Sequence, residues 1–208
     1  MIYSNSTQIT KNIILMTRPT FSLFQSHLDL AHSYWKNHLT PSAHVIDATC
    51  GNGHDSLFLA QYLNSGSLYC LDIQKIAIES TKTLLEKNLP ATNLCSIYFF
   101  NQSHETFPEE IPPCDLIIYN LGYLPGGNKT QTTDTSSTMK SFYRSLQLLK
   151  PKGLISITCY PGHAEGALEQ QALLNIVRDL SPQDYLVCHH TFENRKAAPS
   201  LLLVFKKT

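Results

Sequence analysis

Short apolar runs alternate with segments of helical periodicity along most of the chain. A short apolar run is typical of a buried strand, whereas apolar residues at helical spacing indicate one face of a helix. Strands are predicted at 44–48, 67–72, 94–100, 115–119, 154–160, 185–192 and 201–205. Helices are predicted at 20–39, 56–63, 74–87, 139–149 and 168–180. This alternation indicates an α/β fold, in which a mostly parallel sheet has helices on both faces.

The two ends of the chain depart from this alternation. No crossover helix fits between the last two predicted strands, so they are expected to run antiparallel and to complete a seven-stranded sheet. Residues 1–19 are polar without a period and are expected to form an arm before a single domain at 20–208. The polar run 128–138 is the one long predicted loop, and such loops are often functional.

Composition and charge narrow the classes of partner. The 208 residues are 42% hydrophobic and 15% charged, as in globular proteins. Sixteen basic residues balance sixteen acidic ones, which excludes strong non-specific binding to nucleic acid but allows an RNA read by its shape or a small molecule. No apolar segment is long enough for a membrane span, so a cytoplasmic protein without a membrane partner is expected. The six cysteines and nine histidines lack metal-site spacing, so no metal is predicted.

A glycine loop follows the first predicted strand, with Gly51 and Gly53 just before a helix. In such sheets the ligand lies beyond the carboxyl ends of the strands, near the helix N-terminus. Asp47 ends that strand, where it would repel a pyrophosphate but attract a sulfonium or an ammonium group. Asp72 ends the second strand, nineteen residues after Gly53, where a carboxylate can bind a ribose diol. The alternative is that both aspartates are only helix caps or loop residues.

The run NLGYLPGG, from Asn120 to Gly127, follows the fourth predicted strand. The amide oxygen of Asn120 can accept the hydrogens of an amine and direct its lone pair at a methyl group. The ring of Tyr123 can cover a planar base, and Gly122 would let the acceptor approach the backbone closely. The alternative assigns Asn120 to a turn and Tyr123 to the surface.

Five segments together resemble the class I S-adenosylmethionine (SAM)-dependent methyltransferases, with a Rossmann-like fold: DATCGNGHD, LDIQ, Ser103-His104, NLGYLPGG and the stretch from Gly162 to Gly166. Within that class the chain resembles the rRNA methylase family. Its characterised members methylate the aminomethyl group of the tRNA wobble uridine (the MnmM type). The resemblance extends over about residues 20–208.

This resemblance implies SAM as the cofactor and a role for each matching residue. The methionine moiety would be held by Asp47, Thr49, Gly51, Asn52, Gly53 and Asp55. Asp72 would bind the ribose with Gln74 beside it, and Ser103 and His104 would edge the adenine. Asn120 and Tyr123 would be catalytic, in a run that is similar to the Asn-Pro-Pro-Tyr signature of amino-methylating enzymes. The substrate would meet Gly122, Lys129, His163 and Arg195.

Some features leave alternatives open. Thr49 stands where many methyltransferases have a glycine, and the stretch from Phe192 to Pro199 has fewer Asn and Gln residues than the family leads us to expect. The substrate amine must lose a proton, and His163, Asp134 or water could accept it. His27 and His32, on the first predicted helix, receive no role.

The first functional hypothesis is a SAM-dependent N-methyltransferase acting on the 5-aminomethyl group of (2-thio)uridine at the tRNA wobble position. The anticodon loop would be flanked by a set of basic residues: Lys129, Lys140, Arg144, Arg195 and Lys196. A homodimer could add further positive surface. The alternatives are a methyltransferase of rRNA or of a small amine, an NAD-dependent oxidoreductase and a non-catalytic cofactor sensor.

Overall fold

The computed structural model describes residues 26–122 and 135–208. The strands are β1 (His44–Asp47), β2 (Ser67–Asp72), β3 (Ser96–Asn101), β4 (Cys114–Leu121), β5 (Leu149–Cys159), β6 (Tyr185–His190) and β7 (Ser200–Lys206). The helices are α1 (His27–His38), α2 (His54–Tyr62), α3 (Lys75–Asn88), α4 (Thr135–Leu148) and α5 (Ala164–Arg178). The predicted alternation of strands and helices is therefore confirmed, with shifts at several ends.

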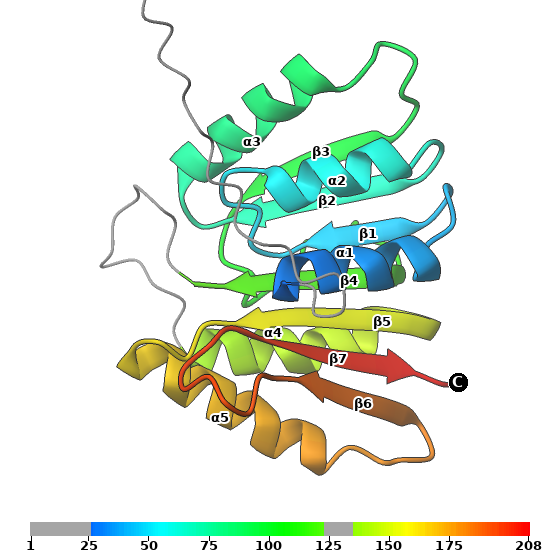
Figure 1. Ribbon diagram of the computed structural model, residues 1–208. Helices are drawn as coiled ribbons and strands as arrows, with labels where there is room; N and C mark the ends of the chain where they lie inside the picture. The colour runs from blue at the N-terminus through cyan, green and yellow to red at the C-terminus, as the bar shows by residue number, and fades with distance from the viewer. Residues whose placement is uncertain (1–25, 123–134) are drawn as a thin grey trace, which may run out of the picture.

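The strands form one seven-stranded sheet in the order β3-β2-β1-β4-β5-β7-β6. The pairs from β3 to β5 are parallel, and β7 runs antiparallel to both β5 and β6, as predicted. Figure 1 shows β1, β4 and β5 pointing one way and β7 pointing the other. The strands β1, β2, β4 and β5 consequently end together, at what we call the carboxyl edge of the sheet.

Helices cover both faces of the sheet, and each face has its own hydrophobic core. One core joins buried residues of α1, α2 and α3, such as Trp35, Leu59 and Leu85, to the sheet. The other joins α4 and α5, through residues such as Phe142 and Leu173. Figure 1 shows α1 and α2 in front of the sheet and α4 behind it. The strand ends at the carboxyl edge are thus held from both sides.

Two predicted boundaries are wrong. The helix α1 begins at His27 rather than at Thr20, because Ser26 caps it by accepting the backbone N–H of Asp29 at 3.1 Å. Thr20 itself lies outside the described residues. The predicted stop at residues 150–153 belongs to β5, where Lys150 Nζ donates to Asp115 Oδ2 at 2.8 Å and binds this stretch to β4. Within this stretch Lys152 has a φ of 62°, in the left-handed region.

The cysteines are free thiols, and Cys50, Cys70, Cys114 and Cys159 are buried, whereas Cys188 is exposed. Over residues 26–122 and 135–208, every helix is too short or too polar to cross a bilayer. In the same ranges no three His, Cys, Asp or Glu side chains converge as metal ligands would.

Candidate active site

The glycine loop turns sharply between β1 and α2. Gly51 and Gly53 have φ values of 52° and 83°, in the left-handed region that favours glycine. A Cβ added at Gly53 would lie 2.8 Å from Thr81 Cα on α3, so a side chain there would meet backbone. The loop therefore presents closely packed backbone and the N-terminus of α2 at the carboxyl edge, which is a surface a ligand can approach.

Asp72 joins this loop to the next one. Its Oδ2 accepts the backbone N–H of Gly51 at 3.0 Å, and its Oδ1 accepts that of Gln74 at 2.8 Å. Burial raises the pKa of Asp72, and these two hydrogen bonds oppose that rise. Each carboxylate oxygen can accept a further hydrogen bond. Ile73, which the sequence reasoning missed, follows it with 59% of its surface exposed and offers an apolar contact for a ligand held by Asp72.

Asp47 faces inward rather than toward solvent. It is 1% exposed, and its carboxylate accepts hydrogen bonds from Ser56 Oγ at 2.6 Å and Thr49 N at 3.2 Å. Burial, and then the charge of Asp55, raise the pKa of Asp47 to about 7, while the hydrogen bonds from Ser56 and Thr49 oppose this. Asp47 thus holds the loop in shape and places a buried acidic group beneath it.

We expect Asp47 to make stability fall as pH rises. The folded protein binds this proton more tightly than the unfolded chain, so unfolding releases it between the ordinary value, about 4, and about 7. One pKa unit corresponds to about 1.4 kcal/mol, so the free energy of unfolding falls by roughly 4 kcal/mol across that pH range. The substitution Asp47→Asn should remove this pH dependence. Urea denaturation from about pH 4 to about pH 8 should show the variant gaining stability over the wild type as pH rises. A constant difference would contradict the raised pKa.

Asn120 lies one residue before the end of β4 and makes two contacts with the glycine loop. Its backbone N–H donates to Thr49 Oγ1 at 2.7 Å, and its Nδ2 donates to Asp55 Oδ2 at 3.1 Å. Because an ionised carboxylate can only accept, Asp55 fixes which end of the amide is the NH₂ and leaves Oδ1 for another donor. The first contact also accounts for Thr49, since a glycine at that position has no hydroxyl to offer.

Helix α1 contributes two histidines that the sequence reasoning left without a role. His32 Nε2 lies 2.7 Å from Asp55 Oδ1, and its ring stacks on Phe58 at a centroid distance of 4.0 Å. His27 Nε2 lies 3.2 Å from the hydroxyl of Tyr160, which follows β5. His27 and Tyr160 are 133 residues apart in sequence, so no local pattern could pair them. They extend the site around Asn120 to the start of α1.

Ser103 and His104 follow β3. Ser103 Oγ accepts the backbone N–H of Glu105 at 3.1 Å. His104 is buried against Tyr119, with the two ring centroids 5.8 Å apart and nearly perpendicular. Burial lowers the pKa of His104 to about 4, so the imidazole is neutral at physiological pH. The structure thus places His104 inside the core beside β4, and its contact with adenine stays a prediction.

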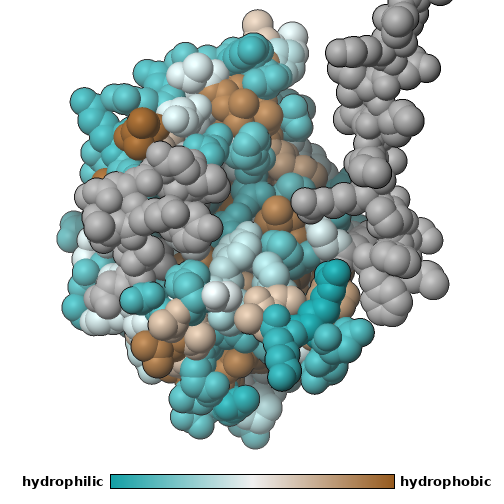
Figure 2. Space-filling model, turned by 60° about the vertical axis from the view of Figure 1, so that its left-hand side comes forward, coloured by the Kyte–Doolittle hydropathy of each residue, from teal (hydrophilic) through white to brown (hydrophobic). Residues whose placement is uncertain are grey.

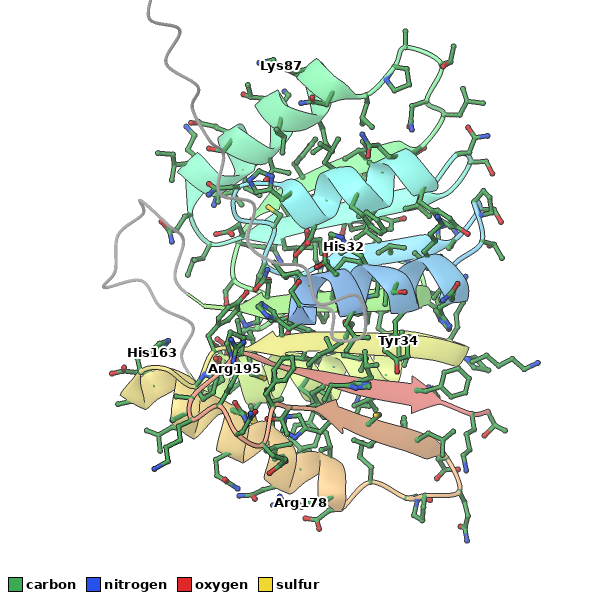
Figure 3. The ribbon with its side chains drawn as sticks, viewed as in Figure 1. His32, Tyr34, Lys87, His163, Arg178 and Arg195 are labelled. Atoms are coloured by element: carbon green, nitrogen blue, oxygen red, sulfur yellow. The ribbon has the colours of Figure 1, made fainter. Side chains whose placement is uncertain are left out.

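Those predicted substrate residues that the structure describes lie near the carboxyl edge. His163 caps α5, because its Nδ1 accepts the backbone N–H of Gly166 at 3.1 Å. Arg195 is exposed, with its guanidinium carbon 5.6 Å from the centre of the Phe192 ring. Figure 3 shows His163 and Arg195 at one end of the sheet. A Cβ added at Gly122 would lie 3.3 Å from the ring of Tyr160. Tyr123, Lys129 and Asp134 lie outside the described residues.

These groups fit a ligand with a ribose and a cationic amino-acid end. Asp72 offers a carboxylate beside exposed apolar surface, and glycine at position 53 lets the loop pack directly against Thr81 of α3. Asn52 and Gln74 stand on either side of this arrangement, exposed and half-buried respectively. The acidic side chains of Asp47 and Asp55 near the loop suit a cation better than a phosphate, although burial raises the pKa of Asp47 and so reduces its negative charge.

Comparisons with known proteins place this arrangement in a family. Residues 68–206 match the family model described as "Putative rRNA methylase". The chain is 35% identical over 188 residues to the chloroplastic tRNA (mnm(5)s(2)U34)-methyltransferase of Arabidopsis thaliana, covering 86% of this chain and 69% of that protein.

Solved structures agree with the family match. A "putative rRNA-methylase" from Clostridium thermocellum superposes with a TM-score of 0.81 at 29% identity, covering 88% of this chain and 98% of that one. A methyltransferase from Streptococcus mutans in complex with S-adenosylhomocysteine (SAH) gives 0.78 at 28% identity, covering 88% and 99%. The chain therefore belongs to the rRNA methylase family of SAM-dependent methyltransferases and has the class I methyltransferase fold that its sequence predicted.

Proposed function

We propose that the protein transfers a methyl group from SAM to the 5-aminomethyl nitrogen of a uridine, with or without a 2-thio group, at the wobble position of tRNA. The observation that supports this most directly is the restraint on Asn120 at the carboxyl edge, where its backbone N–H donates to Thr49 and its side-chain amide donates to Asp55. The Arabidopsis relative, whose name specifies this position, supports the substrate.

SAM supplies an electrophilic methyl carbon on its sulfonium. The residues of the chain provide position. In the proposal, Asp72 holds the ribose, and the loop from Asp47 to Asp55 holds the methionine end. The amide oxygen of Asn120 accepts hydrogens of the amine and directs its lone pair, which requires the amide to be held in one orientation. Asp55 supplies that restraint through its 3.1 Å contact with Nδ2.

The RNA would bind across the carboxyl edge. Arg195 and Lys196 are exposed in the segment between β6 and β7, next to Phe192, whose ring could stack with a base. Lys140 is also exposed, although it pairs with Glu105 at 2.6 Å. Figure 2, which brings this end of the molecule forward, shows polar surface interspersed with apolar residues. The zero net charge of the chain suits a small contact area on an anticodon loop, because a larger contact would neutralise more phosphates.

Two parts of the proposal concern the setting of the reaction. We place it in the cytoplasm, although the Arabidopsis relative is named chloroplastic. A homodimer stays a prediction. The contact between the two copies could include an apolar groove at the edge strand β6. Leu186, Val187 and Phe205 are among the residues that line it.

Ribosomal RNA is the second candidate substrate, because the family description names it. Nucleoside mass spectrometry of tRNA and rRNA from cells lacking the gene separates the two. We expect aminomethyl-uridine to accumulate in tRNA in place of its methylated form, and the wild-type gene to restore the methylated nucleoside. A normal tRNA profile with a missing methylated nucleoside in rRNA would overturn the tRNA assignment. Purified protein with SAM and unmethylated tRNA should reproduce the reaction in vitro.

A further inference from the structure

Tyr160 lies beside the residues proposed to hold the acceptor amine. It follows β5, and the register pairs Cys159 with Leu121, so Tyr160 comes next to Gly122 just beyond Asn120. The ring is close enough that a Cβ on Gly122 would lie 3.3 Å from it. Its hydroxyl lies 3.2 Å from His27 Nε2, and on the other side the Asn120 side chain is near enough to oppose the rise in its pKa. The hydroxyl therefore stands between the amide and an imidazole.

We propose that Tyr160 and His27 form the proton acceptor for the substrate amine, with the tyrosine hydroxyl relaying the proton to the imidazole. The inference rests on the proposed function, because only a protonated amine needs such an acceptor. It assigns a catalytic task to α1 and to the end of β5.

The proton balance of the relay is simple. The substrate ammonium gives one proton to the Tyr160 oxygen while the Tyr160 O–H proton passes to His27 Nε2. The tyrosine ends neutral, as it began, and the imidazole becomes imidazolium. The amine now has a free lone pair, and its nitrogen forms a bond to the methyl carbon as the carbon–sulfur bond of SAM breaks. The sulfur keeps that electron pair, so the products are a methylated ammonium and SAH, and the imidazolium then loses its proton to water.

The surroundings suit each member of the relay. Burial lowers the pKa of His27, so the ring is neutral and able to accept near physiological pH. The carboxylates of Asp55 on α2 and Asp29 on α1 face His27 and act in the opposite direction, which stabilises the imidazolium once it forms. Burial, and then the charge of Asp55, raise the pKa of Tyr160 to about 12, so the tyrosine passes a proton on rather than holding a phenolate.

His163 is less suited to the same task. Its Nδ1 lone pair already accepts the backbone N–H of Gly166, where it caps α5. The His27 ring instead presents Nε2 to the Tyr160 hydroxyl, with the two ring planes at 89°. In this edge-on arrangement the ring nitrogen lies near the hydroxyl oxygen, as a proton transfer requires.

The test measures kcat for methylation of an anticodon stem-loop RNA containing aminomethyl-uridine, as a function of pH. Tyr160→Phe keeps the ring and removes only the hydroxyl, and His27→Gln keeps a polar side chain. Near pH 7, each variant should lose about a hundredfold in kcat. The loss should shrink toward about threefold near pH 9.5, because a larger share of a primary amine is then already deprotonated. The double variant should be no slower than either single one.

Controls and outcomes separate the relay from a structural role. Tyr143→Phe on the exposed side of α4 and His38→Gln at the far end of α1 should keep kcat, and SAH affinity should be unchanged in all variants. A methylating wild type whose Tyr160→Phe variant loses the same factor at every pH, or loses nothing, overturns the relay alone. A wild type that binds SAH but leaves the aminomethyl group unmethylated overturns the proposed function, and the relay with it.

Discussion

Replacing Asn120 by alanine is expected to lower kcat for methyl transfer by about a thousandfold, because one aligned polar group at a reacting centre contributes on this scale. The variant loses the amide that would hold the amine, while the backbone N–H of residue 120 still donates to Thr49 Oγ1. The glycine loop and Asp72 should therefore keep their positions. Single-turnover kinetics with saturating SAM measure the loss, and calorimetry should find SAH affinity within about threefold of the wild type.

Two matched variants sharpen this experiment. Asn120→Asp keeps the shape but sets a second carboxylate against Asp55, so it should be as inactive as the alanine variant. Asn175→Ala, in an exposed position on α5, should leave kcat unchanged. Full turnover by Asn120→Ala would show that the amide has no part in the chemistry.

Replacing Asp72 by asparagine is expected to weaken SAH binding by about a hundredfold, or close to 3 kcal/mol, as for a truncated charge-assisted hydrogen-bond pair. The wild-type carboxylate would accept both ribose hydroxyls while it holds Gly51 and Gln74 in register. An amide has one accepting oxygen, so its NH₂ would face a donor. The loop would lose one of its two contacts as well as the ligand.

The pH dependence gives this prediction a second readout. Burial raises the pKa of Asp72, and only the ionised carboxylate accepts both hydroxyls, so wild-type affinity should begin to fall at a higher pH than for an exposed aspartate. The asparagine variant should lack that fall. Asp115→Asn is the control. Asp115 also accepts a backbone N–H, that of His44 at 2.8 Å, but it lies near the start of β4, away from the carboxyl edge. Loss of SAH affinity in that control would point to general destabilisation.

Local pattern located the strand ends and the glycine loop, whereas the cofactor contacts of their residues stay a prediction. Asp47, Gly51, Gly53 and Asp72 stand at fixed distances from strand ends that their own apolar runs define, and parallel strands bring those ends together. Helix and strand periodicity acts over a few residues, so these elements could be located from the sequence. The run after the fourth predicted strand indicated Asn120, and the structure holds its amide beside the loop.

The remaining parts depend on contacts that no local pattern encodes. Thr49 and Asn120 are 71 residues apart, and His27 and Tyr160 are 133 apart, so their meeting follows from the strand order and from how α1 crosses the sheet. The predicted start of α1 was wrong because Thr and Ser both favour the cap position, so the sequence offered Thr20 as well as Ser26, which caps the helix. His27 and His32 looked like ordinary helix residues because α1 lies beyond the strand–loop–helix unit that a cofactor motif describes.

The contacts of Asp55 have a consequence for how the two substrates bind. The Asp55 carboxylate contacts His32 on α1 and Asn120 on β4 through hydrogen bonds. In the proposal it also contacts the methionine end of the donor. A shift of Asp55 caused by one of these partners would therefore move the others. We expect this path to couple the two ligands, and linkage then requires that the donor alter RNA affinity by the same factor as RNA alters donor affinity. The demethylated donor, which would occupy the same site, should act as a competitive inhibitor toward its methylated form.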